Sequence, residues 1–280
     1  MKQAVLFILI TLLFFSLIAN MESTEKSFSY EDYSLILANY VDEEGRVNYK
    51  KLKENETELM AFLQALESLE VQVYKSWSQE ESIAFWINAY NALTLKAILE
   101  NYPIKPSFFK SLKFPKNSIR QIPGVWDTMT FTVMGEELTL DFIEHQVLRK
   151  KFQEPRIHFA LVCAAQGCPP LRQEPYKGEA LSEQLDDQAQ RFLSDRRNFF
   201  IDRKKGKVYL SSIFKWYGED FFTPDSSEEM FKGYKPRVKD VLNYISRYLS
   251  EGENKFLGEE SLKVKYLDYD WALNEQGEIK

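Results

Sequence analysis

The scarcity of cysteine is the feature that most constrains what this chain folds into. Its 280 residues include only two Cys, so the fold cannot be a scaffold built from disulfides. A hydrophobic core must hold the protein together instead. The composition, 44% hydrophobic and 28% charged, has the ordinary balance of a globular protein.

Helical spacing of apolar residues dominates the chain. The clearest helix is predicted from Ser78 to about Asn101, because Ser78 and Glu81 form a capping box and Pro103 stops the helix. Further helices are predicted over residues 30–40, 52–69, 140–151, 182–193, 212–216 and 236–249, and strands over 128–134, 157–163, 207–210 and 262–266. We see no internal repeat and no interdomain linker. The pattern therefore predicts an α+β fold, a single mostly helical globular domain with a small β-sheet.

The first nineteen residues have the layout of a cleavable export signal. One cation precedes an apolar run from Ala4 to Ala19, and a small residue lies at its end. The run is about sixteen residues, shorter than the roughly 20 that a spanning helix needs. We predict a signal peptide over 1–19, with an uncleaved anchor as the alternative, then a disordered leader over 20–28 and one domain over 29–280. The expected location is periplasmic or extracellular, with no stable membrane insertion after signal removal.

The charge pattern argues against nucleic acid as a partner. The net charge is -6, and acidic and basic residues are mixed along the chain, so no basic surface is predicted. Aromatic residues make up 15% of the chain, which we interpret as a core rich in Phe and Tyr.

Histidine and cysteine are concentrated in one segment. The only residues of these two types lie within 24 positions: His145, His158, Cys163 and Cys168. Nucleophilic catalysis is the first interpretation, with Cys168 held in a Gly-Cys-Pro-Pro turn after the strand predicted over 157–163. His145 would then be the general base, oriented by Asp141 or Glu144, and His158 the alternative base.

Three other interpretations of this segment remain open. Two Cys and two His are a ligand set of structural zinc, although the spacing fits no standard zinc motif. A Cys163–Cys168 disulfide suits an exported protein, provided that the turn brings the Cα atoms within about 7 Å. Inert packing is the last interpretation. We assign no metal and no cofactor.

Four other polar residues are candidates for substrate contacts. Asn88 and Asn91 share one face of the apolar helix. They either tie down a loop by hydrogen bonds or line a cleft as donors to a developing oxyanion. Arg149 and Arg156 flank the entry to the predicted strand, where either one pairs with Glu144 or clamps a carboxylate.

At several segments the chain resembles the domain of unknown function 547 (DUF547) family. The matching segments are FWINAYNA (85–92), IEHQVLR (143–149), PRIHFALVC (155–163), GCPPL (167–171), IFKWY (213–217) with Asp220-Phe221, and YDWALN (269–274). The resemblance implies a family found in exported bacterial proteins and as a module of larger plant proteins, with no established reaction. The family's motifs include Glu144, His145, Arg149, Arg156, His158, Cys163 and Cys168.

Two function classes follow from these observations. The first is an exported hydrolase or transferase that acts on an amide or ester through a thioester at Cys168. The second is a non-enzymatic envelope module that binds a small-molecule or peptide-like ligand. Its Cys163–Cys168 pair would be structural, and aromatic residues such as Trp86, Trp126 and Trp216 would line its cleft.

Overall fold

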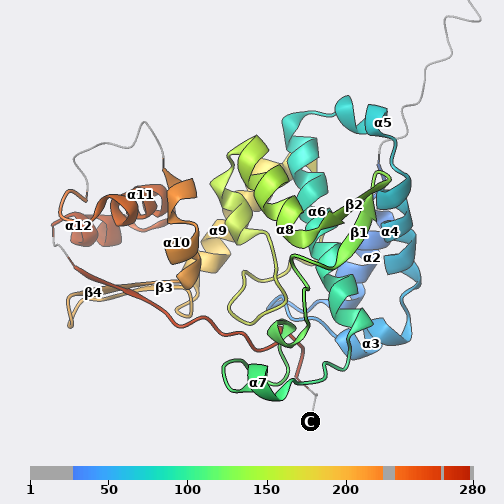
Figure 1. Cartoon of the computed structure of the whole chain (residues 1–280). Coiled ribbons are helices and arrows are strands. Elements are labelled where there is room, and N and C mark those ends of the chain that lie inside the picture. The colour runs from blue at the N-terminus through green and yellow to red at the C-terminus, as the bar shows by residue number, and fades with distance from the viewer. Residues whose placement is uncertain (1–27, 223–230, 260–261, 278–280) are drawn as a thin grey trace, which may run out of the picture.

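The computed structural model of the chain describes residues 28–222, 231–259 and 262–277 (Figure 1). The predicted signal peptide, 1–19, lies outside these ranges, as does the predicted leader except for Phe28. The ring of Phe28 packs edge-on against Phe85, with 5.2 Å between the centroids. Phe28 is therefore part of the folded structure.

Helices make up most of the described chain. The α-helices are α2 (Glu31–Tyr40), α3 (Tyr49–Glu54), α4 (Thr57–Ser68), α5 (Val71–Lys75), α6 (Gln79–Glu100), α7 (Phe108–Ser111), α8 (Leu140–Phe142), α9 (Leu181–Ser194), α10 (Ser212–Trp216), α11 (Pro236–Ile245) and α12 (Glu251–Glu259). Short 3-10 helices lie at Ile119–Gln121, Pro155–Phe159, Gly178–Ala180, Gly218–Phe221 and Ser246–Tyr248, and a π-helix lies at Ile143–Phe152.

The strands form two small sheets. They are β1 (Thr130–Val133), β2 (Glu136–Thr139), β3 (Phe199–Asp202), β4 (Lys207–Leu210) and β5 (Lys263–Tyr266). An antiparallel hairpin joins β1 to β2, while β4 pairs antiparallel with β3 and parallel with β5. The prediction of a mostly helical α+β fold is confirmed.

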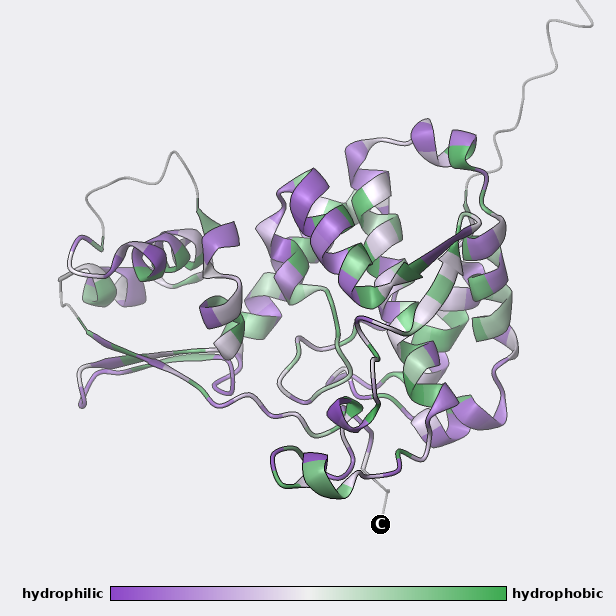
Figure 2. Cartoon of the chain, in the orientation of Figure 1, coloured by the Kyte–Doolittle hydropathy of each residue, from purple (hydrophilic) through white to green (hydrophobic). Residues whose placement is uncertain are grey.

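Helix α6 is the centre of the larger of two hydrophobic cores. Every residue from Ser82 to Leu99 except Lys96 is buried, as expected for a helix that is apolar on all sides. Its predicted capping box is present, since Ser78 Oγ accepts from the Glu81 backbone N–H and the Glu81 carboxylate accepts from the Ser78 N–H. Figure 2 shows apolar residues along this helix and polar ones on the outer faces of its neighbours.

Helix α9 joins this first core to the second. Leu181 and Leu185, near its start, are buried in the first core, whereas Phe192 and Leu193, near its end, are buried with β3, β4, α10 and α11. The second core also contains Phe159. The chain then returns to the first core: residues 270–274 run beside residues 164–167 and hydrogen-bond to them through the backbone.

The prediction of a strand over 157–163 is wrong. Residues Pro155–Phe159 form a 3-10 helix instead, and Ala164 then turns with a positive φ of 56°. The backbone of this segment bonds to a side chain rather than to a neighbouring strand. Asn91 Nδ2 donates to the Ala160 carbonyl at 3.0 Å, and Asn91 Oδ1 accepts from the Val162 N–H at 2.9 Å. A short apolar run does not by itself distinguish a strand from another buried segment.

The helix predicted over 140–151 exists with an unexpected geometry. Thr139 caps it as predicted, by accepting a hydrogen bond from the Phe142 N–H, but Ile143–Phe152 forms a π-helix. Such wide turns are rare and often occur at functional sites.

No helix in the described ranges is both long enough and apolar enough to span a membrane.

We predict that Asn91→Ala lowers the free energy of unfolding by about 2–4 kcal/mol, because it leaves two buried backbone groups without partners. Urea denaturation measures this change. Asn117→Ala is the matched control, since its exposed side-chain amide donates to the Glu275 carboxylate and to no buried backbone group of the described chain, and its cost should stay under about 1 kcal/mol. Equal costs for the two variants would contradict the role given to Asn91.

Candidate functional site

A cleft of about 710 Å³ lies between the two cores. Its walls come from α6, residues 110–127, the π-helix, residues 158–169, the α10 region and residues 269–271. The lining residues used below are Tyr90, Arg120, Trp126, Asp141, Glu144, His145, His158, Cys163, Trp216, Tyr217, Tyr269 and Trp271.

Tyr90 contacts the carboxylate of Glu144, and Tyr217 and Tyr269 lie near enough to be affected by its charge. The side chain of Glu144 is nearly buried, and the Tyr90 hydroxyl donates to its Oε2 at 3.1 Å. Burial raises the pKa of Tyr90, Tyr217 and Tyr269, and the neighbouring Glu144 charge raises each of the three further. These phenols therefore remain protonated at neutral pH and present O–H donors to the cleft.

Behind this cluster, the carboxylate of Asp220 holds Arg149 and His158 in place. Asp220 accepts a bidentate pair from Arg149, with Nε–Oδ2 and Nη2–Oδ1 distances of 2.6 and 2.9 Å. His158 Nε2 also lies 2.7 Å from Asp220 Oδ2. Burial acts to raise the pKa of Asp220, but the hydrogen bonds from His158 and Arg149 outweigh it and hold the pKa below its ordinary range. The His158 ring stacks on Tyr217 with centroids 4.2 Å apart.

The geometry around His145 does not leave a nitrogen for general-base catalysis. Its Nδ1 lies 3.0 Å from Arg149 Nη1. A guanidinium has no acceptor atom, so Nδ1 must accept this bond. The proton of neutral His145 is then on Nε2, 3.3 Å from Asp141 Oδ1. Of the two orienting residues considered for His145, Asp141 contacts the ring, whereas Glu144 bonds to Tyr90. Both ring nitrogens are occupied.

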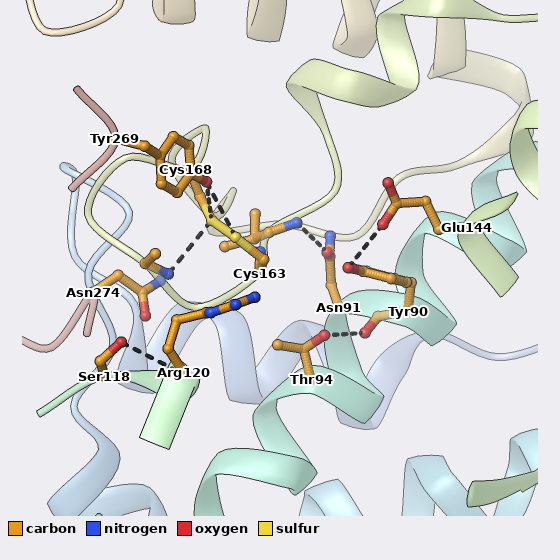
Figure 3. The surroundings of a disulfide bond; sticks show 12 residues. Tyr90, Asn91, Thr94, Ser118, Arg120, Glu144, Cys163, Cys168, Tyr269 and Asn274 are labelled. Carbon is orange, nitrogen blue, oxygen red and sulfur yellow. Dashed lines mark hydrogen bonds between the residues drawn. A yellow bond between two sulfur atoms is a disulfide. The ribbon is translucent and has the colours of Figure 1, made fainter. Parts of the chain in front are cut away.

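Cys163 and Cys168 are joined by a disulfide, with 6.2 Å between their Cα atoms (Figure 3). The Tyr269 hydroxyl lies 3.1 Å from Cys168 Sγ and 3.2 Å from Cys163 Sγ. Since a disulfide sulfur carries no proton, the tyrosine is the donor. Gly167 permits this close approach, because a Cβ at that position would lie 3.1 Å from the Tyr269 ring.

This bond corrects the expectation of a nucleophilic thiolate at Cys168. The thiolate is the reactive form of cysteine, and neither sulfur in the disulfide is a thiolate. Cys168 is also buried, and Cys163 is the cysteine that lines the cleft. Within the described ranges, no hydrogen bond joins His145 to either sulfur.

The remaining predicted substrate contacts lie away from the cleft and support the structure. Asn88 Nδ2 donates to the Tyr176 carbonyl and Asn88 Oδ1 accepts from the Tyr176 N–H, so Asn88 and Asn91 each hold a loop. Arg156 pairs with Glu154 and Asp186 rather than with Glu144, and it fixes the 3-10 helix against α9. Of the aromatic residues expected in the cleft, Trp126 and Trp216 line it, while Trp86 is buried and donates to the Tyr74 hydroxyl.

Sequence reasoning missed Arg120, which lies on an aromatic surface of the cleft. Its guanidinium carbon lies 4.6 Å from the ring centroid of Phe114, 5.3 Å from that of Trp126 and 5.1 Å from that of Trp271. Figure 3 shows its side chain pointing toward the disulfide. Around it in the described chain, no side chain accepts a hydrogen bond from the guanidinium. No signal in the sequence connects Arg120 with Trp271, because they are 151 positions apart.

Metal ligation has no support from the groups described here. Across residues 28–222, 231–259 and 262–277, no three His, Cys, Asp or Glu side chains converge on a point that could hold an ion.

We expect the protein, purified without reductant, to have an intact mass two hydrogens below that of the dithiol. Neither cysteine should react with iodoacetamide until the bond is reduced. Peptide mass spectrometry reads each cysteine separately. A fast-reacting thiol at Cys168 in the unreduced protein would contradict the disulfide and restore thiol catalysis.

Asp220→Asn should lower the free energy of unfolding at pH 7 by about 2–3 kcal/mol, since it breaks charge-assisted bonds in a partly buried network. The pKa of Asp220 is lower in the folded state than in the unfolded state, so its contribution is complete above the unfolded pKa of about 4 and is lost as the pH falls below it. The variant should therefore show a shallower loss of stability between about pH 5 and pH 2. Chemical denaturation at several pH values tests this, with the exposed Asp268→Asn as control. Parallel pH profiles for Asp220→Asn and the wild type would refute the assignment.

Comparison with known families identifies part of the chain. Residues 74–193 match the family model described as "Protein of unknown function, DUF547". The match covers α6, the π-helix and the disulfide loop, and it ends within α9. No curated protein and no solved structure matches the chain.

Proposed function

We propose that this chain, whose residues 74–193 match the DUF547 family model, is an exported binding protein whose cleft captures a small organic anion. The ligand class is a carboxylate carried on a ring, such as a sugar acid or an aromatic acid. The export signal predicted over 1–19 supports the exported location.

The observation that carries this proposal is the position of the Arg120 guanidinium, which lies against aromatic rings and has no acidic partner in the described chain. A guanidinium offers five N–H donors in a planar fork that suits a carboxylate. Here that fork lies on three aromatic rings at the cleft wall, without an acidic side chain of the described chain to neutralise it. Stacking on aromatic rings partly desolvates the cation, which favours an incoming anion.

The rest of the cleft suits the body of such a ligand. Its volume is within the range of about 300–1,000 Å³ that holds small molecules. Trp126, Trp216 and Trp271 give it flat apolar surfaces. At the other side, the Tyr90 and Tyr217 hydroxyls and the Glu144 carboxylate provide polar groups that can orient hydroxyls of the ligand.

Binding fits the geometry better than catalysis does. The residues that could move protons are engaged with one another: His145 with Arg149 and Asp141, and His158 with Asp220. The sulfurs are engaged in the disulfide.

A thiol-dependent hydrolase or transferase acting on an amide or ester is the second candidate. The observation in its favour is the position of the disulfide, whose Cys163 lines the cleft. Reduction would free the two thiols beside the Tyr269 hydroxyl. Turnover of thioester-forming substrates that appears only with reductant, and is lost in Cys168→Ala, would favour this candidate.

Arg120→Gln should weaken binding of ring carboxylates by about 10-fold to 100-fold, the equivalent of a charge-assisted pair of hydrogen bonds. We would titrate glucuronate and benzoate by calorimetry, each beside its neutral amide. The wild type should prefer each acid to its amide, and the preference should disappear in the variant.

The matched control is Arg196→Gln. Arg196 also lies over an aromatic ring, 4.6 Å from the centroid of Phe200, but it is not part of the cleft. This variant should bind like the wild type. The proposal fails if no acid is preferred over its amide, or if Arg120→Gln and Arg196→Gln behave alike.

A further inference from the structure

Three large apolar side chains are exposed together on one short segment. Phe108, Phe109 and Leu112 have exposed fractions of 77%, 80% and 76%, the three highest among the large exposed hydrophobic residues of the described chain. They lie on and just after α7, within residues 105–116, which we call the α7 loop. Single exposed apolar residues are ordinary, but a contiguous cluster marks an interaction site.

The charge of the α7 loop is opposite to that of the chain as a whole. The loop contains four lysines and no acidic residue, in a chain of net charge -6. The lysines are Lys105, Lys110, Lys113 and Lys116. They alternate with the apolar residues along the loop. Lys110 Nζ also donates to the Gln121 and Ile122 carbonyls, so the other three lysines are the ones left to meet a partner surface.

The loop is held in this position by a buried side chain. Gln121 is only 3% exposed. Its Oε1 accepts from the Ser107 N–H at 2.9 Å, and its Nε2 lies 3.3 Å from Ser111 Oγ. Two residues at the ends of α7 are thus fixed to the body of the protein. Figure 1 shows α7 at the edge of the molecule, and its two Phe side chains are 77% and 80% exposed there.

We propose that the α7 loop docks the protein on the surface of a membrane that contains anionic lipids. Phe108, Phe109 and Leu112 enter the boundary between headgroups and acyl chains, as interfacial segments do. The lysines of the loop other than Lys110 contact the lipid phosphates, each contributing about 1 kcal/mol near an anionic surface. The loop lies on the bilayer and does not cross it, which agrees with the absence of a spanning helix in the described ranges.

The positive charge of the α7 loop favours an anionic membrane over a second copy of this chain as the partner of this surface. If two copies paired through their α7 loops about a twofold axis, each would bring its four lysines against those of the other. Like charges in contact are unfavourable. An anionic lipid surface satisfies the apolar residues and the cations together.

The docking surface adjoins the cleft, but the membrane proposal does not require the cleft to bind an anion. Lys110, Lys113 and Phe114 of the loop also line the cleft. Docking would therefore bring the cleft close to the lipid headgroups. The test below uses a local signal from the loop and vesicles without any cleft ligand, so it can fail or succeed independently of the binding proposal.

The experiment uses the full chain with Phe109→Trp, mixed with vesicles of phosphatidylcholine and phosphatidylglycerol carrying brominated acyl chains. We expect the tryptophan emission to shift to shorter wavelength and to be quenched, both relative to the unsubstituted chain. The signal should be weaker on pure phosphatidylcholine and in high salt. Because the reporter lies on α7, contact of the apolar run over 4–19 with lipid does not produce it. Phe222→Trp is the matched control, since Phe222 is 61% exposed outside the loop, and it should show neither change.

In the Phe109→Trp background, Lys105→Gln with Lys116→Gln should raise the lipid concentration at half-saturation by about 30-fold, from about 1 kcal/mol per lysine. Neither lysine lines the cleft. Lys50→Gln with Lys51→Gln, a pair of exposed lysines on α3, should leave it unchanged.

Three results would overturn the proposal. The first is an emission of the Phe109→Trp chain that lipid does not shift, and the second is an equal response on neutral lipid. The third is a shift that follows protein concentration without lipid, which would identify a second copy as the occupant.

Discussion

The carboxylate of Asp220 connects the two cores of this protein at the cleft. It lies in the 3-10 helix Gly218–Phe221, beside the second core, and it bonds to Arg149 on the π-helix and to His158 in the 3-10 helix Pro155–Phe159. Because these bonds fix His158, the ring of Tyr217 that stacks on it is fixed too. The position of Tyr217 near Glu144 is therefore supported by Asp220.

The π-helix gives this network its geometry. Glu144 and Arg149 are five residues apart on it, yet Glu144 meets Tyr90 of the first core while Arg149 reaches Asp220 of the second. His145, next to Glu144, bonds to Arg149. A wide turn costs backbone stability, and its presence where three polar side chains converge agrees with the tendency of π-helices to occur at functional sites.

The return of residues 269–274 to the first core completes the cleft. This segment hydrogen-bonds to the disulfide loop, and Asn274 accepts a hydrogen bond from the buried Tyr49 hydroxyl at 2.7 Å. It thereby places Tyr269 over the sulfurs and Trp271 beside Arg120. The proposed anion site and the α7 loop share one side of the cleft, so a ligand of the cleft and a lipid surface would meet the protein close together.

The sequence by itself determined the local features of this protein. The capping box at Ser78, the cap at Thr139 and most helices followed from residue type and spacing, because these depend on neighbours within a few positions. Asp141, one turn before His145, was one of the two orienting residues considered for the same reason. The family motifs also included several residues that line the cleft, among them Glu144 and His158. What those residues do was decided only by the tertiary structure. The run over 157–163 had strand composition, but the amide of Asn91 took its backbone partners and left no ladder to form. Arg149 paired with a carboxylate 71 positions away, and Arg120 met Trp271 from the other end of the chain. Such contacts depend on how distant segments pack, and a pattern read along one chain carries no information about that packing.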